Sequence, residues 1–124
     1  MDRYLLVLLG GGVGALCRYV LAGAIMRRFG GAFPLGTLVI NVTGCFMIGL
    51  FMTLFTERLD PHPNWRLALV VGFLGGYTTF SSFEYETYQS IRDGSHWTAL
   101  LNVASSVLLG YIAVVCGALA AGRH

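Results

Sequence analysis

The sequence has no lysine and few charged residues of any kind. Only 11% of its 124 residues are charged, against roughly 25% in soluble domains. The net charge of +2 is too small to indicate a nucleic-acid partner. The three cysteines form no CxxC motif and no His/Cys cluster, which argues against a disulfide framework and against a zinc site. These absences exclude most soluble classes of protein.

Apolar residues and glycine are abundant instead. Apolar residues make up 56% of the chain and its mean hydropathy is +0.69, which predicts an all-α integral membrane protein. The 17 glycines suit closely packed membrane helices. A transmembrane helix needs about 20 apolar residues. Four runs meet or approach this length, so we expect one domain over 1–124 with spans near 4–26, 33–56, 66–90 and 97–122. The first run is too long for a signal peptide.

The third predicted span is interrupted by residues 72–86, which read GFLGGYTTFSSFEYE. Glycine pairs lower helix stability, and the threonine and serine hydroxyls would have no partner in hydrocarbon. Irregular backbone inside a membrane is tolerated only where it is buried in protein or lines a watery cavity. We therefore expect the helix to unwind at Gly75–Gly76, and we expect the functional site to lie at this break.

The arginines are divided almost evenly between the two sides of the membrane. If there are four spans, one side holds Arg3, Arg58, Arg66 and Arg123, and the other holds Arg27, Arg28 and Arg92. Two interpretations of this weak bias stay open. In one, the first loop alone fixes the orientation, and in the other the chain inserts both ways. Four short helices cannot both bury and enclose a polar track, so we expect a homo-oligomer. Insertion in both orientations would give an antiparallel dimer.

The second predicted span carries polar residues on one helix face. Thr37, Asn41 and Gly44–Cys45 are spaced by about four residues, so their side chains line up along the helix. Asn41 either joins two helices by a hydrogen bond or presents its N–H donors to an anion in a conduit. Both interpretations remain open at this point.

The fourth predicted span repeats this spacing with Asn102, Ser106 and Gly110. The two polar faces, together with hydroxyls at the break such as those of Thr78 and Thr79, predict one continuous hydrogen-bonding track. Such a track is typical of a membrane conduit rather than of a purely structural helix bundle.

Three further residue types bear on function. Arg18 lies inside the first span with no acidic partner in the first two spans, and it either extends to the interface or attracts anions in a watery vestibule. Phe80 and Phe83 are three residues apart and so share a face of the resumed helix. They are core residues, or their positive ring edges meet a small anion. Glu86 lies three residues further on and extends the same face.

Three segments of the sequence resemble the Fluc/CrcB family of small bacterial fluoride-specific ion channels. They are residues 10–19 (GGGVGALCRY), 34–41 (PLGTLVIN) and 72–83 (GFLGGYTTFSSF), and the resemblance covers essentially the whole chain. It implies a dual-topology antiparallel homodimer in the bacterial inner membrane. It also implies that the dimer has two pores, through which toxic cytoplasmic fluoride leaves passively.

The resemblance also assigns residues. The implied fluoride pore is lined by Asn41, Phe80, Phe83, Glu86 and Ser106, with Arg18 in its vestibule. From the polar track we expect Thr37 and Thr79 to line it as well. Backbone carbonyls of Gly75 and Thr78 would hold a structural sodium ion (Na⁺) at the dimer interface, which is not transported. Tyr77 and Glu84 depart from the family pattern.

Two other classes of membrane protein compete with a fluoride channel. Small proton-coupled multidrug exporters also have four spans and dual topology, but they carry a carboxylate in the first span, where this chain has Arg18. A non-conducting membrane subunit is the second alternative. An enzyme is not expected, because no nucleophile–base pair lies at membrane depth.

Overall fold

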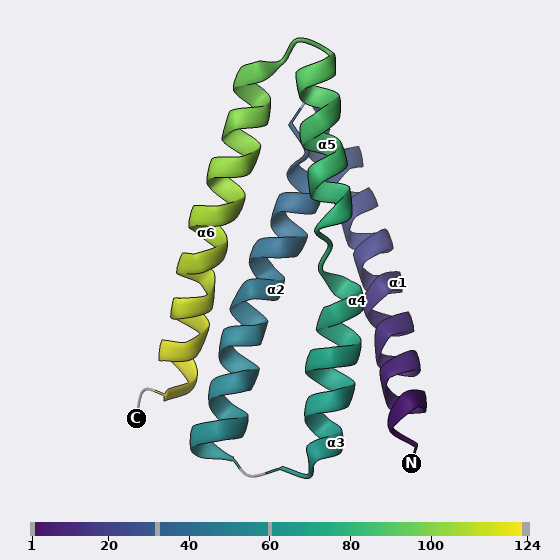
Figure 1. Ribbon diagram of the computed structural model, residues 1–124, viewed down its shortest axis with the longest axis vertical. Helices are drawn as coiled ribbons and strands as arrows, with labels where there is room; N and C mark the ends of the chain where they lie inside the picture. Colours follow the sequence, from purple (N-terminus) through teal and green to yellow (C-terminus); the bar gives the residue numbers. More distant parts are fainter. Residues whose placement is uncertain (1, 32, 60, 123–124) are drawn as a thin grey trace.

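The computed structural model describes residues 2–31, 33–59 and 61–122, and these residues form helices joined by short turns. Arg123, counted above for topology, lies outside them. Figure 1 shows that the start of α1 (Arg3–Phe29), the start of α3 (Pro63–Arg66) and the end of α6 (His96–Gly122) lie at the same end of the molecule. Three helices are long and apolar enough to cross a membrane. The protein is therefore a multi-pass membrane protein.

Three of the crossings are single long helices. They are α1 (Arg3–Phe29), α2 (Leu35–Thr53), which continues as the π-helical turn η1 (Leu54–Arg58), and α6 (His96–Gly122). Their interiors contain mostly apolar residues, and their ends coincide with the arginines, prolines and glycines of the connections. These bounds include the residues expected for the first, second and fourth spans, apart from 33 and 34, which precede α2.

The remaining crossing is assembled from short pieces. In order these are α3 (Pro63–Arg66), the π-helix η2 (Leu67–Leu74), α4 (Gly75–Tyr77) and, after a break at 78–80, α5 (Ser81–Arg92). Neither part of this crossing reaches the ~20 residues that a continuous span needs, so only the two parts together can cross. Figure 1 shows α4 and α5 one above the other, joined by a short non-helical segment.

The break begins after the glycine pair and not at it. Gly75 has helical angles (φ −60°, ψ −38°), and the backbone first becomes extended at Thr78 (φ −87°, ψ 158°). The prediction that the helix unwinds at Gly75–Gly76 is wrong. A Cβ atom added to Gly76 would overlap the carbonyl of Gly11 in α1. The glycine is therefore explained by close packing against α1, not by unwinding.

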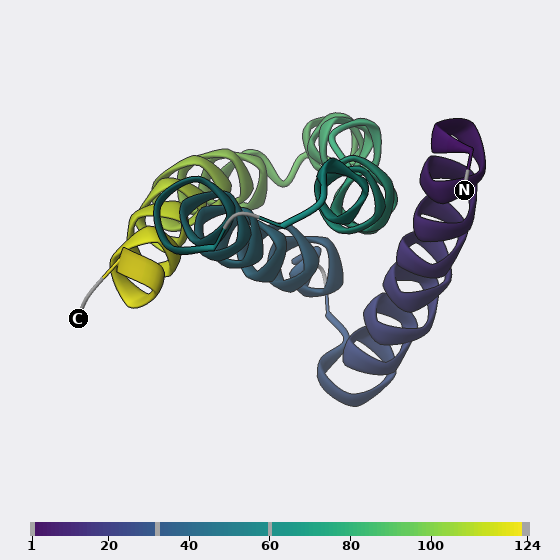
Figure 2. The same cartoon turned by 90° about the horizontal axis from the view of Figure 1, so that it is seen from below.

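The GxxxG spacing of Gly10 and Gly14 has the same explanation. A Cβ at Gly10 would lie 2.5 Å from the carbonyl oxygen of Ala68, and one at Gly14 would overlap the backbone of Phe73. Gly10 and Gly14 thus serve close helix packing, as expected for glycines of membrane helices. Figure 2, viewed from below, shows α1 at one side of the molecule beside the η2–α4 segment, and α6 at the opposite side beside α2.

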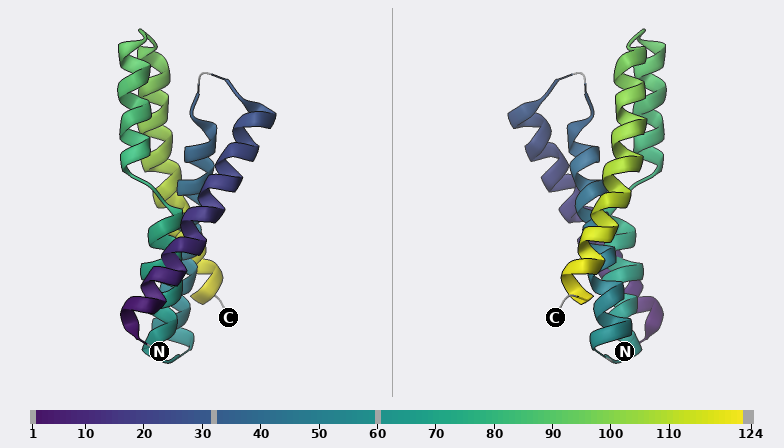
Figure 3. Two further views of the ribbon diagram at one scale, coloured as in Figure 1. Left: turned by 90° about the vertical axis from the view of Figure 1, so that its right-hand side faces the viewer. Right: turned by 90° about the vertical axis from the view of Figure 1, so that its left-hand side faces the viewer.

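The buried core of a single chain is small. Eight apolar side chains are buried in the described residues, and three of them, Ile40, Leu74 and Tyr77, form one cluster with a few partly buried neighbours. Many large apolar side chains of α1 and α6 are exposed. The side views in Figure 3 show α1 crossing the other helices obliquely, so that its C-terminal end lies apart from α5 and α6. In a membrane protein such faces contact lipid or another subunit.

Candidate functional site

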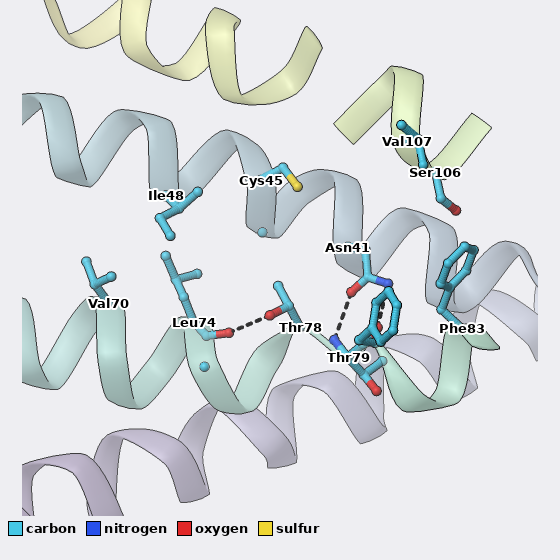
Figure 4. Close-up of a pocket in the computed structure, with 13 residues that line it drawn as sticks. Asn41, Cys45, Ile48, Val70, Leu74, Thr78, Thr79, Phe83, Ser106 and Val107 are labelled. Carbon is cyan, nitrogen blue, oxygen red and sulfur yellow. Dashed lines mark hydrogen bonds between the residues drawn. The ribbon is translucent and has the colours of Figure 1, made fainter. Parts of the chain in front are cut away.

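The break is held open by one side chain of α2. The Asn41 Nδ2 atom donates to the carbonyl of Thr79 at 2.8 Å, and its Oδ1 atom accepts the N–H of Thr79 at 2.9 Å (Figure 4). Because the two partners are a backbone acceptor and a backbone donor, the orientation of the amide is fixed. Asn41 thus joins α2 to the non-helical segment of the third crossing. The amide nitrogen carries two N–H groups, and Thr79 uses one of them.

The same bonds free two carbonyl groups from the helix. In an unbroken α-helix the Thr79 N–H would bond to Gly75, and the Ser82 N–H would bond to Thr78. The first is instead donated to Asn41, and the second is donated to Thr79 Oγ1 at 3.2 Å. The carbonyls of Gly75 and Thr78 therefore lose their helical donors. These are the two carbonyls that the sequence predicts as cation ligands.

Arg18 reaches the break from the opposite side. Its Nε atom donates to the carbonyl of Gly76 at 3.0 Å, and the side chain is half-buried. Of the two positions left open for Arg18, the structure places it against protein, at the break. A guanidinium group has five N–H donors, so its others remain available to the cavity that it lines.

A cavity of about 400 Å³ lies beside the break, between α2, α6 and the third crossing. Many of the predicted site residues line it: Asn41, Gly75, Thr78, Thr79, Phe80, Phe83 and Ser106. The rest of its wall is mostly apolar and includes Cys45, Ile48 and Val107 (Figure 4). We call this space the break cavity. The lining residues described by the structure carry no formal charge, so polarity there comes from amide, hydroxyl and backbone groups.

Phe80 and Phe83, the phenylalanine pair, lie close together in this cavity. Their ring centroids are 5.9 Å apart, with the ring planes tilted by 55°. Phe80 lies in the break itself and is 72% exposed, whereas Phe83 lies in the first turn of α5 and is 8% exposed. The pair therefore has one ring inside the subunit and one at its surface, although the sequence predicts two rings on one face of a helix.

Ser106 contributes a hydroxyl without an internal partner. Its Oγ atom is buried and has no hydrogen-bond partner within the described residues. The neighbouring Ser105 instead donates to the carbonyl of Leu101, four residues back on the same helix. Figure 4 shows Ser106 on the same side of the cavity as Phe83. The Ser106 hydroxyl is thus a donor that the described protein groups leave unused.

A second cavity, of about 300 Å³, lies between α1, α2 and the start of α5. It contains the other predicted site residues, Arg18, Thr37 and Glu86, and it shares Thr79 with the break cavity. We call it the arginine cavity. Thr37 Oγ1 donates to Glu86 Oε2 at 2.9 Å, while Glu86 Oε1 is buried without a partner in the described part of the chain. The polar residues thus lie along two cavities that have Thr79 as a common lining residue.

Two polar contacts involve Thr87 and Thr43, which sequence reasoning missed. Asn102 is buried and its Nδ2 atom donates to Thr87 Oγ1 at 3.0 Å, so it does not line either cavity. The Tyr77 hydroxyl lies 2.8 Å from Thr43 Oγ1. The sequence offered one signal for the contact of Asn102 with Thr87: Thr87 lies four residues after Phe83 and therefore on the same face of α5. Tyr77 is one of the two departures from the family pattern, and this contact gives its hydroxyl a partner.

In the parts of the chain that the structure describes, no three His, Cys, Asp or Glu side chains are grouped so as to hold a metal ion. A cation at the break would therefore depend on backbone oxygens such as those of Gly75 and Thr78.

Comparison with known proteins identifies the family. The profile described as "CrcB-like protein, Camphor Resistance (CrcB)" matches residues 5–118. A protein of Solibacter usitatus named fluoride-specific ion channel FluC is 66% identical over 121 residues, which cover 98% of this chain and 99% of the relative. A protein of the same name from Acidobacterium capsulatum is 50% identical over 98% of this chain and 97% of its own length. Another, from a Sulfurihydrogenibium species, is 43% identical over 94% of this chain and 94% of its own length. The chain therefore belongs to the CrcB family.

Proposed function

We propose that this protein is a fluoride-selective channel through which toxic fluoride leaves the cytoplasm passively. The observation that carries the proposal is the break cavity, where an amide, an unpartnered hydroxyl and the phenylalanine pair converge at a helix break. The names of the relatives, fluoride-specific ion channels at up to 66% identity, support the same conclusion.

Fluoride is small and strongly hydrated, so a selective pore must replace its water with closely placed donors. The break cavity offers the second N–H of Asn41 and the hydroxyl of Ser106. The N-terminal end of α5 adds the partial positive charge of a helix that starts inside the membrane. The ring edges of the phenylalanine pair are also electropositive. Because none of these groups is an ion, fluoride would bind weakly enough to leave again.

The arginine cavity would serve as the vestibule of this pore. Arg18 supplies a positive charge that raises the local concentration of anions. Thr37 and Glu86, joined by their hydrogen bond, lie on the side of this cavity away from the break, and Thr79 lines both cavities. In this proposal an anion passes from Arg18 to the break cavity along Thr79.

A second copy of the chain would complete the pore. Phe80 lines the break cavity and yet is 72% exposed, so the cavity wall is incomplete in one subunit. The even arginine distribution supports insertion in both orientations. We therefore propose an antiparallel, dual-topology homodimer with two pores in the inner membrane of a bacterium.

The freed carbonyls of Gly75 and Thr78 fit a structural sodium ion. Hard oxygen ligands suit a small cation, and bare carbonyls in a dry interior would cost several kcal/mol each. One subunit supplies two such oxygens, so a full ligand set needs the partner as well. The ion would satisfy these oxygens and hold the subunits together without being transported.

A liposome assay tests the proposed conduction. Purified protein is reconstituted in vesicles loaded with potassium fluoride or potassium chloride, with equal pH on both sides, and valinomycin is added to release potassium. We expect rapid fluoride efflux and little chloride efflux. Equal efflux of both anions would contradict the proposed selectivity. A requirement for a proton gradient would indicate a coupled exporter, and no efflux would indicate a non-conducting subunit.

Two further experiments test the dimer and the sodium ion. Added positive charges that bias insertion should abolish fluoride efflux in each single version and restore it when two oppositely biased versions are co-expressed. Replacing sodium by N-methylglucamine should stop efflux, and returning sodium should restore it without uptake of radioactive sodium. Full activity of one strictly oriented version would exclude the antiparallel arrangement, and full activity without sodium would exclude the structural ion.

A further inference from the structure

Asn102 is the one buried polar residue in the described chain that neither cavity uses. Its side chain is only 1% exposed. Its Nδ2 atom donates to Thr87 Oγ1 at 3.0 Å, and Thr87 Oγ1 donates to the carbonyl of Phe83 at 2.9 Å. This chain of two hydrogen bonds runs from the second turn of α6 to the turn of α5 that carries the inner ring of the phenylalanine pair.

The register of the two helices makes this contact relevant to the break cavity. α5 and α6 form an antiparallel hairpin, in which Gly94 at the turn has φ +83°. Asn102 is bonded to Thr87, so one helical turn along both helices Ser106 is opposite Phe83. Both members of this second pair line the break cavity. A hydrogen bond between the first pair therefore sets the relative position of the second.

Apart from the hydrogen bond of Glu86 to Thr37 in α2, little else holds this part of α5. The helix is short, starts directly after the break and packs chiefly against α6, with only slight contact to α2. Apolar packing between two helices is non-directional and permits sliding or rotation. A hydrogen bond between fixed side chains fixes the register, as a single buried asparagine does in coiled coils.

We propose that Asn102 is a positioning residue that fixes the ring of Phe83 opposite Ser106 in the break cavity. This inference rests on the proposed function of that cavity. The Oδ1 atom of Asn102 is buried without a partner in the described residues, which is unfavourable for stability. An apolar residue of similar size would avoid that penalty, so the asparagine is explained by positioning rather than by stability.

The test combines a stability measurement with a probe on the ring itself. The full-length protein carries 4-fluorophenylalanine at position 83, and its 19F resonance is compared in wild type, Asn102→Leu and Thr87→Val. We expect the resonance to shift or broaden in both variants. The unfolding midpoint of Asn102→Leu should equal or exceed that of wild type, because the unpartnered oxygen is gone. Thr87→Ser, which keeps the hydroxyl, should restore the wild-type resonance.

Matched controls separate positioning from general disturbance. Thr56 Oγ1 also bonds to a carbonyl four residues back, that of Met52, without contact to an asparagine. Thr56→Val should leave the label at position 83 unchanged. A label at Phe29, at the far end of α1, should not respond to any of these variants. An unmoved resonance at position 83 in both Asn102→Leu and Thr87→Val overturns the inference.

Fluoride efflux gives the functional readout. Asn102→Leu should lower efflux by roughly five- to tenfold, the scale of one net hydrogen bond. The double variant with Thr87→Val should lower it no further, because both changes break one chain of bonds. Additive losses would contradict the proposal. A wild-type protein that passes no fluoride would refute the proposed function. The 19F measurement does not depend on conduction, so it would still test the position of the Phe83 ring in that case.

Discussion

Replacing Asn41 by leucine tests whether one side chain keeps the helix break open. Leucine has nearly the same size and no hydrogen-bonding groups. The substitution removes the bonds of 2.8 and 2.9 Å to the carbonyl and the N–H of Thr79. Both backbone groups lie within the membrane span, where water does not readily take the place of the lost partners.

The size of the effect follows from these two groups. An unsatisfied buried donor or acceptor costs about 1–3 kcal/mol, so the loss of both predicts a destabilisation of about 2–6 kcal/mol. The lower end applies if the segment relaxes until the Thr79 N–H reaches the carbonyl of Gly75. That relaxation would extend the helix, close the break and occupy one of the freed carbonyls. Fluoride efflux should fall below detection in either case.

The assay measures reversible unfolding in mixed detergent micelles and fluoride efflux from liposomes on the same preparation. Thr43→Val is the control on the same helix, because Thr43 bonds to the Tyr77 hydroxyl and lines neither cavity. It should cost about 1 kcal/mol of stability and leave efflux intact. A wild-type unfolding midpoint in Asn41→Leu would refute the account of the break. A lowered midpoint with normal efflux would show that Asn41 is structural only.

Three other predictions test the packing and the pore lining. Gly76→Ala should destabilise the protein because overpacking, typically about 1–3 kcal/mol, exceeds the gain in helix propensity. At Gly12 an added Cβ meets nothing within 4 Å. Gly12→Ala should therefore raise the free energy of unfolding by up to about 1 kcal/mol. Ser106→Ala should reduce fluoride efflux by roughly three- to tenfold, whereas Ser105→Ala should not change it. Replacing either member of the phenylalanine pair by isoleucine should sharply reduce efflux, while size-exclusion chromatography should still show the assembled protein. Wild-type efflux in both variants would mean that the rings serve only core packing.

The sequence predicts those features of the fold and the site that depend on one physical requirement. The length and apolarity of the runs predict the long helices, because few soluble alternatives suit such a composition. The polar residues of the spans were identifiable because each is unfavourable in hydrocarbon without a role. Asn41 and Ser106 therefore appear as candidates from sequence and lie in one cavity in the structure.

The details of the third crossing could not be read in the same way. Glycine is compatible with unwinding and with close helix packing, and only the position of Gly11 decides between these for Gly76. The π-helix at Leu67–Leu74 has no sequence pattern of its own, because the same apolar run suits an α-helix. The bond between Asn102 and Thr87 depends on the register of two helices, which spacing within one helix does not determine.

The helix break separates two kinds of backbone group, and this separation explains how one segment could serve two ions of opposite charge. The half-helix ending at Tyr77 leaves carbonyl oxygens, and the half-helix starting at Ser81 leaves N–H groups. Asn41 satisfies one group of each kind at Thr79. The carbonyl oxygens that remain at the end of the first half-helix suit a cation. The N–H groups that remain at the start of the second half-helix suit an anion. A fluoride pathway beside a fixed sodium ion therefore needs no buried carboxylate at the cation site, which agrees with the uncharged lining of the break cavity.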